Sequence, residues 1–187
     1  GISVDQTNQL LKGFDRNTAT GKRDYAITRC FVDLGLRTPE VASLTLDDID
    51  WRQGLMYIRG KGRRVDVLPL PAATGRAIVT YLHQGRPQTN SRALFLRHRP
   101  PLHMPATCSI VRAAVRCAAR RSGVERCFHG PRVLRHTLAE RLVQRATPLK
   151  HIADLLRHRS LDTTAIYAKV DLSALSRVAL PWPGRQS

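Results

Sequence analysis

The spacing of apolar residues changes twice along the chain, and these changes restrict the fold more than any other feature. Residues 20–34 carry apolar side chains at helical spacing, residues 46–69 alternate apolar with polar side chains, and helical spacing returns over residues 106–156. Alternation is typical of a half-buried strand, and recurrence at three and four residues is typical of an amphipathic helix. The sequence therefore predicts an α+β fold, mostly helical, in which a single domain carries one small three-stranded antiparallel sheet.

Turn and cap residues divide these regions into elements. Gln53-Gly54 and the glycines on either side of Lys61 are turn signals, and Pro39 and Pro71 suit the first turn of a helix. The predicted strands are 46–51, 55–60 and 65–69, with a further short strand at 93–96 in a polar loop. The predicted helices are 4–15, 20–34, 39–44, 71–84, 106–121, 132–144, 148–156, 162–168 and 172–179.

The charge of the chain points to a polyanionic partner. Among 187 residues, of which 42% are apolar, 31 Lys and Arg face 14 Asp and Glu, which leaves a formal charge of +17. Such an excess repels itself in the folded state, and a bound polyanion offsets it. Nucleic acid is favoured over an acidic membrane surface, because no apolar run approaches the ~18 residues of a membrane span.

The cysteines and the first residues indicate a cytoplasmic protein without a metal site. The four cysteines form no CxxC pair, and the N-terminal "GISVDQTNQLL" lacks the basic start and apolar block of a secretion signal. We therefore expect reduced thiols, a cytoplasmic location and no bound metal.

Four stretches concentrate side chains suited to one kind of chemistry. In "LGLRTPE", Glu40 stands three residues after Arg37 and would orient its guanidinium toward a ligand, although a purely structural ion pair fits as well. In "RGKGRR", the cations Lys61, Arg63 and Arg64 lie at a hairpin tip, where a solvated turn is the plain alternative.

The other two stretches lie in the C-terminal part of the chain. In "HGPRVLRHTLAERL", Arg132 and Arg135 share a face near a helix N-terminus, which favours a bound anion over a solvated basic face. In "LLRHRSLDTTAIYAKV", His158 ends one helix and Tyr167 lies in the next, where a packed tyrosine and a surface histidine are the alternative.

Taken together and in this order, the four stretches resemble the catalytic domain of the tyrosine recombinases, the phage integrase family. The resemblance runs from about residue 20 to residue 170, and it includes the 22 residues between Arg135 and His158 and the eight between His158 and Tyr167. It implies that the whole chain, residues 1–187, is one catalytic domain, with 1–19 and 171–187 as edge segments. It also implies that the N-terminal domain with which relatives clamp DNA is absent, either excised or naturally missing.

The resemblance implies a mechanism for site-specific recombination of double-stranded DNA. Tyr167 would attack a phosphodiester and form a 3′-phosphotyrosyl intermediate, while Arg37, Arg135 and His158 stabilise the transition state. Lys61 would protonate the leaving 5′-oxygen as general acid. No cofactor is implied, and self-association into a synaptic tetramer on DNA is expected.

Two positions depart from the family pattern. Arg132 stands where the family usually has a histidine, and a guanidinium cannot accept a proton from tyrosine, though it can stabilise phosphate or phenolate. His136 would face the interior and support the site, and His129 is another candidate base. Arg157 replaces a common glycine, which would strain the backbone if that position needs a positive φ.

Two alternative functions and one question about packing remain open at this point. The chain could be a degenerate DNA-binding protein of the same fold that does not cleave, and Arg132 favours that hypothesis. A type IB topoisomerase shares the same catalytic residue types. The predicted helix 172–179 could pack on its own domain or dock on a neighbouring protomer.

Overall fold

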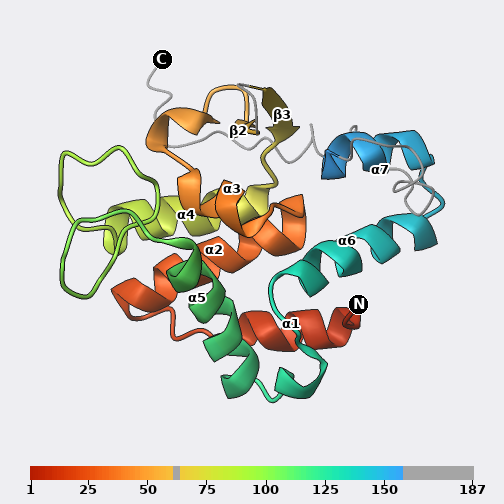
Figure 1. Cartoon of the computed structure of the whole chain (residues 1–187), viewed down its shortest axis with the longest axis horizontal. Coiled ribbons are helices and arrows are strands. Elements are labelled where there is room, and N and C mark those ends of the chain that lie inside the picture. The colour runs from red at the N-terminus through yellow and green to blue at the C-terminus, as the bar shows by residue number, and fades with distance from the viewer. Residues whose placement is uncertain (61–63, 158–187) are drawn as a thin grey trace.

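The computed structural model describes residues 1–60 and 64–157 (Figure 1). Predicted helices 162–168 and 172–179, together with Lys61, Arg63, His158 and Tyr167, lie outside the described residues. No described helix has the length and apolar character that crossing a membrane requires.

The described chain is mostly helical and carries one small sheet, as predicted. The α-helices are α1 (Val4–Lys12), α2 (Ala19–Leu34), α3 (Thr38–Ser43), α4 (Ala72–Gln84), α5 (Cys108–Arg121), α6 (Arg132–Gln144) and α7 (Leu149–Leu156). Two 3₁₀ turns, η1 (Leu46–Asp48) and η2 (Glu125–Cys127), and three strands, β1 (Ile49–Asp50), β2 (Leu55–Arg59) and β3 (Val65–Pro69), complete the elements.

Helix α2 forms the centre of the main core. It runs through the middle of the molecule, with the β2–β3 hairpin above it and α1 below it in Figure 1. Helices α4, α5 and α6 all pack against it. Ten of its sixteen residues are buried, including Ile27 and Phe31, which are 0% and 1% exposed. Burial of these apolar side chains is the main favourable term that holds the helices together.

The end of α2 requires a glycine. Gly35 caps the helix in the left-handed region, with φ 57°, and its N–H donates to the Phe31 carbonyl. A Cβ at this position would lie 2.8 Å from Leu156 Cδ2 and 3.0 Å from Leu138 Cδ2. The missing side chain therefore serves both the backbone conformation and the close approach of α6 and α7.

The sheet has the order β1-β2-β3, and both neighbouring pairs are antiparallel. The prediction of a strand over 46–51 is wrong in its first half. Asp48 Oδ2 accepts hydrogen bonds from the Thr45 N–H and the Thr45 hydroxyl, at 2.8 and 2.7 Å, and this local cap stabilises the 3₁₀ turn η1 instead. Only Ile49 and Asp50 pair with β2.

The long polar segment after α4 has no regular strand. In place of the predicted strand 93–96 there are two isolated bridges, Thr45↔Ala93 and Leu96↔Pro105. Tyr81, which is fully buried, accepts the Leu96 N–H at 3.2 Å through its hydroxyl. Because its ring packs in the core while its hydroxyl binds the loop, Tyr81 joins the two parts of the fold.

A second, smaller apolar cluster lies between α6 and α7. It consists of Leu138, Ala139, Leu142, Ile152 and Leu156. These residues hold α7 against α6, at the right of Figure 1, and so determine where the last described carbonyl groups lie.

Candidate active site

Arg37 stands at the N-cap of α3, between the left-handed Gly35 and Pro39. Its Nη1 donates to Glu40 Oε1 at 2.8 Å, and its backbone N–H donates to Glu40 Oε2 at 2.6 Å. The Arg37 side chain is 47% exposed, while that of Glu40 is 9% exposed. The ion pair suggested by the sequence is therefore present, and it leaves the guanidinium open to solvent on one side.

Arg135 comes from the second turn of α6 and is held by backbone carbonyls. Its Nη1 donates to the Gly35 carbonyl at 2.5 Å, and its Nη2 donates to the Leu156 carbonyl. Both carbonyls stand at helix C-termini, where backbone oxygens lack intrahelical partners and carry partial negative charge. The guanidinium of Arg135 thus joins the ends of α2 and α7.

The two arginines meet at the end of α7. Arg37 Nη2 donates to the Arg157 carbonyl at 3.3 Å, next to the Leu156 carbonyl that receives Arg135. Segments far apart in sequence therefore bring two guanidiniums to consecutive backbone groups. The residue that follows in sequence is His158, which lies outside the described part of the chain.

Arg157 has a positive φ, 53°, so the condition under which a residue in this glycine position is strained is met. Its side chain is only 4% exposed, and its Nη2 donates to Glu40 Oε2 at 2.6 Å. Its Nη1 donates to the Leu155 carbonyl at 3.2 Å, and its Nε lies 3.9 Å from Asp66 Oδ2. The residue in the glycine position is therefore strained in its backbone and tightly held in its side chain.

The carboxylate of Glu40 is stabilised in its charged form. Burial alone would raise its pKa, but the charge of Arg157 and the hydrogen bonds from Arg37 hold the pKa of Glu40 below its ordinary value. Burial also lowers the pKa of Arg157, and the nearby carboxylate of Glu40 opposes that shift.

The remaining predicted residues that are described lie at the surface. Arg132, the first residue of α6, is exposed, and Arg64 is 76% exposed with its Nε 3.6 Å from Asp66 Oδ1. The expectation that His136 faces the interior is wrong. Leu134, Thr137 and Leu138 occupy the inward face of α6, so the intervening position 136 points to solvent.

His129 is exposed as well. The structure describes no contact that brings either His129 or His136 to the two arginines. Among residues 1–60 and 64–157, no group of three His, Cys, Asp or Glu side chains is arranged to hold a metal ion.

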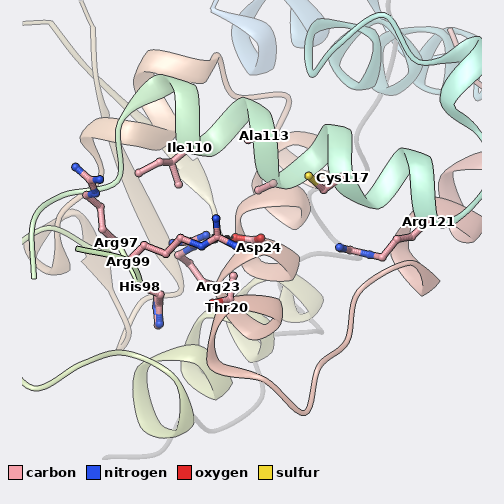
Figure 2. Close-up of a pocket in the computed structure, with 11 residues that line it drawn as sticks. Thr20, Arg23, Asp24, Arg97, His98, Arg99, Ile110, Ala113, Cys117 and Arg121 are labelled. Atoms are coloured by element: carbon pink, nitrogen blue, oxygen red, sulfur yellow. Dashed lines mark hydrogen bonds and ion pairs between the residues drawn. The ribbon is translucent and has the colours of Figure 1, made fainter. Parts of the chain in front are cut away.

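A separate cavity of about 330 Å³ lies between α2, α5 and the segment 97–99 (Figure 2). Arg23 and Asp24 form a buried ion pair there, at 2.7 Å between Nη2 and Oδ1, and Arg23 also donates to the Leu96 carbonyl. Figure 2 shows Arg121 pointing toward this pair from the end of α5. None of the residues predicted as site residues lines this cavity.

Sequence reasoning did not single out this cavity, although the run "RHR" at 97–99 was a signal for it. Burial raises the pKa of Asp24 despite the charge of Arg23, and burial followed by the charge of Arg23 lowers the pKa of His98. Asp24, the carboxylate of this cavity, is already paired with Arg23. The other charged side chains of the described wall are arginines, so the cavity is better suited to an anion than to a metal ion.

Similarity to known proteins agrees with the fold. The model of the phage integrase family matches residues 2–173. The chain is 44% identical over 183 residues to the putative integrase/recombinase y4rA of Sinorhizobium fredii, covering 98% of this chain and 44% of that protein. It is 37% identical over 188 residues to the putative integrase/recombinase y4gC of the same organism, covering 99% of this chain and 96% of that protein.

A solved structure shares the fold. The XerH site-specific recombinase bound to its difH substrate, in a pre-cleavage complex, superposes with a TM-score of 0.75 at 23% identity, over 95% of this chain and 53% of that one. The chain thus spans less than half the length of y4rA, about half of XerH and almost all of y4gC. With a family model matched over nearly its whole length, the chain belongs to the phage integrase family.

Proposed function

We propose that the chain is the catalytic part of a site-specific DNA recombinase, which cleaves and rejoins DNA through a 3′-phosphotyrosyl intermediate. The observation that supports this most directly is the convergence of Arg37 and Arg135 on the Leu156 and Arg157 carbonyls, immediately before His158 in sequence. Two guanidiniums fixed at one place suit the non-bridging oxygens of a phosphate that gains negative charge in the transition state.

The anchoring of these arginines favours catalysis rather than binding alone. Arg135 is held by two carbonyls, and Arg37 by Glu40 and one carbonyl, so neither has to reorganise when charge develops on the phosphate. Preorganised donors of this kind stabilise a transition state without a reorganisation cost at the moment of reaction.

The attacking and leaving groups belong to residues outside the described part. In the proposed step, the Tyr167 hydroxyl gives its proton to water as its oxygen bonds to phosphorus, and the bond from phosphorus to the 5′-oxygen breaks. Lys61 gives its proton to that 5′-oxygen, and His158 donates a hydrogen bond to the phosphate. Rejoining is the reverse reaction, with a 5′-hydroxyl as attacking group and Tyr167 as leaving group, so the phosphodiester energy is conserved.

The described ends of the β2–β3 hairpin support the roles proposed for Lys61, Arg63 and Arg64. The Gly60 N–H donates to the Arg64 carbonyl at 2.7 Å, so the two strand ends that flank residues 61–63 are joined. Arg64 at this tip is exposed, and we assign Arg63 and Arg64 to contacts with DNA phosphates.

The partner we propose is double-stranded DNA. The formal charge of +17 is suited to phosphate neutralisation, and the XerH relative of the same fold is bound to its difH substrate. We also propose self-association into a synaptic tetramer on DNA.

The test is covalent trapping on a nicked suicide duplex that carries the cognate site and loses its 5′-hydroxyl strand after cleavage. The wild-type chain should form a covalent protein–DNA adduct, and Tyr167→Phe should bind the same DNA without forming one. Equal trapping by both proteins would show that the nucleophile is wrong.

A non-cleaving DNA-binding protein is the second candidate, favoured by Arg132, whose exposed guanidinium takes the position of a usual proton acceptor. Arg132→His separates the two candidates on the same substrate. If wild type forms no adduct and Arg132→His does, the natural chain is impaired in cleavage. If both form adducts at similar rates, Arg132 is tolerated and the recombinase proposal holds.

A further inference from the structure

Arg157 combines two features that seldom occur together in one residue. Its φ of 53° lies in the left-handed region, which a residue with a Cβ adopts at a cost, and its long charged side chain is 4% exposed. Such a residue persists only where surrounding contacts hold it. The contacts that hold Arg157 lead to Arg37.

Arg157, Glu40 and Arg37 form a closed ring of hydrogen bonds. The Arg157 Nη2 donates to Glu40 Oε2 at 2.6 Å, and the other carboxylate oxygen of Glu40 accepts Arg37 Nη1 at 2.8 Å. Arg37 Nη2 then donates to the Arg157 carbonyl at 3.3 Å, which closes the ring. The side chain and the carbonyl of Arg157 therefore act on the same guanidinium from two directions.

We infer that Arg157 is a positioning residue, which fixes the guanidinium of Arg37 for phosphate by tying the end of α7 to Glu40. The left-handed backbone directs its carbonyl to Arg37, and the buried fork of its side chain holds that backbone in place through Glu40. With regard to DNA cleavage, the inference rests on the proposed function; with regard to the placement of Arg37, it does not.

The shape of arginine matters for this role. Its guanidinium contacts Glu40 through Nη2 and the Leu155 carbonyl through Nη1, while Nε faces Asp66 Oδ2 at 3.9 Å. An ammonium group is a point charge and cannot make this fork of contacts. A glycine would relax the backbone but remove the tie to Glu40.

Arg157→Gly and Arg157→Lys are the variants for the test, and two readouts are measured on the whole chain. The first is the side-chain Nε–Hε NMR signal of Arg37 in the free protein, whose order reports the placement of the guanidinium. The second is the single-turnover rate of adduct formation on the suicide duplex, measured well below the melting temperature of each variant. A matched control is Arg120→Ala, which removes an ion pair of similar length, Arg120–Glu125 at 2.8 Å, from exposed positions on α5 and η2.

The inference predicts that Arg157→Gly disorders the Arg37 signal and slows adduct formation roughly 10- to 100-fold, because displacement of a positioned group by about 1 Å costs up to that factor. Arg157→Lys should give smaller changes in the same direction, and Arg120→Ala should change neither readout. A purely structural role would lower the melting temperature of Arg157→Gly and leave both readouts unchanged, which would overturn the inference.

The two proposals fail separately. If the wild-type chain forms no adduct but the Arg37 signal still loses order in Arg157→Gly, the proposed function fails and the positioning role stands. If Arg157→Gly does not fold, Arg157→Lys decides, and an unchanged Arg37 signal in that variant would refute the positioning role.

Discussion

Replacing Gly35 by alanine should destabilise the chain by more than its left-handed conformation alone would require. The left-handed backbone costs a residue with a Cβ about 1–2 kcal/mol, and the smaller entropy of the unfolded alanine chain returns about 0.4–1 kcal/mol. The new Cβ would also lie 2.8 Å from Leu156 Cδ2 and 3.0 Å from Leu138 Cδ2. Overpacking of this kind adds about 1–3 kcal/mol, so the total loss in the free energy of unfolding is about 1–5 kcal/mol.

The matched control is Gly123→Ala. Gly123 also has a positive φ, 72°, but no atom lies within 4 Å of a Cβ built there. Its loss in the free energy of unfolding should be smaller, about 0–2 kcal/mol, since only the backbone terms remain. Urea denaturation of both variants, followed by circular dichroism, measures the difference.

The comparison isolates the contact between the end of α2 and the α6–α7 cluster. Equal losses for Gly35→Ala and Gly123→Ala would refute the packing of Leu138 and Leu156 against Gly35. Gly35→Ala should also slow adduct formation if the chain cleaves DNA, because Leu156 must move and its carbonyl holds Arg135.

Three further predictions follow from buried groups. Burial alone would raise the pKa of Glu40, but the two arginines beside it hold that pKa below its ordinary value of 4.5, so the carboxylate stabilises the fold above that pH. The difference in unfolding free energy between wild type and Glu40→Gln should therefore be constant from pH 7 to about 5 and should shrink as the pH falls through the lowered pKa of Glu40. A difference that stays constant down to pH 3 would contradict the stabilising role of this carboxylate. Burial raises the pKa of the Cys30 thiol, so mass spectrometry should find iodoacetamide on the exposed Cys117 and Cys127 well before Cys30 in the folded chain, and equal rates would argue against the burial of α2. Tyr81→Phe leaves a buried backbone N–H without its acceptor and should cost about 1–3 kcal/mol in chemical denaturation, whereas no loss would mean that water replaces the hydroxyl.

The elements were predictable where local spacing decides them. Helix 132–144 and strand 65–69 have the predicted bounds, because their apolar positions follow the periods of 3.6 and 2. The strand at 46–51 was predicted too long, since Asp48 satisfies the backbone of Thr45 locally and the alternating pattern does not report such a side-chain cap.

The candidate site was predictable only in part. The pairing of Arg37 with Glu40 follows from their spacing of three residues. The second partner of Glu40, Arg157, is 117 residues away along the chain, and no local pattern can indicate that contact. The orientation of His136 was mispredicted, because the identity of its neighbours on α6 decides which face is inward.

The oxygens that receive Arg37 and Arg135 at the end of α7 belong to the main chain, and every amino acid brings the same oxygen to these positions. An alanine scan would therefore pass over Leu156 as a mere packing residue, because truncating its side chain leaves the acceptor in place. Replacing the peptide bond after Leu156 by an ester would weaken the Leu156 carbonyl oxygen as an acceptor. The effect of that exchange would reveal how much this oxygen contributes to holding Arg135.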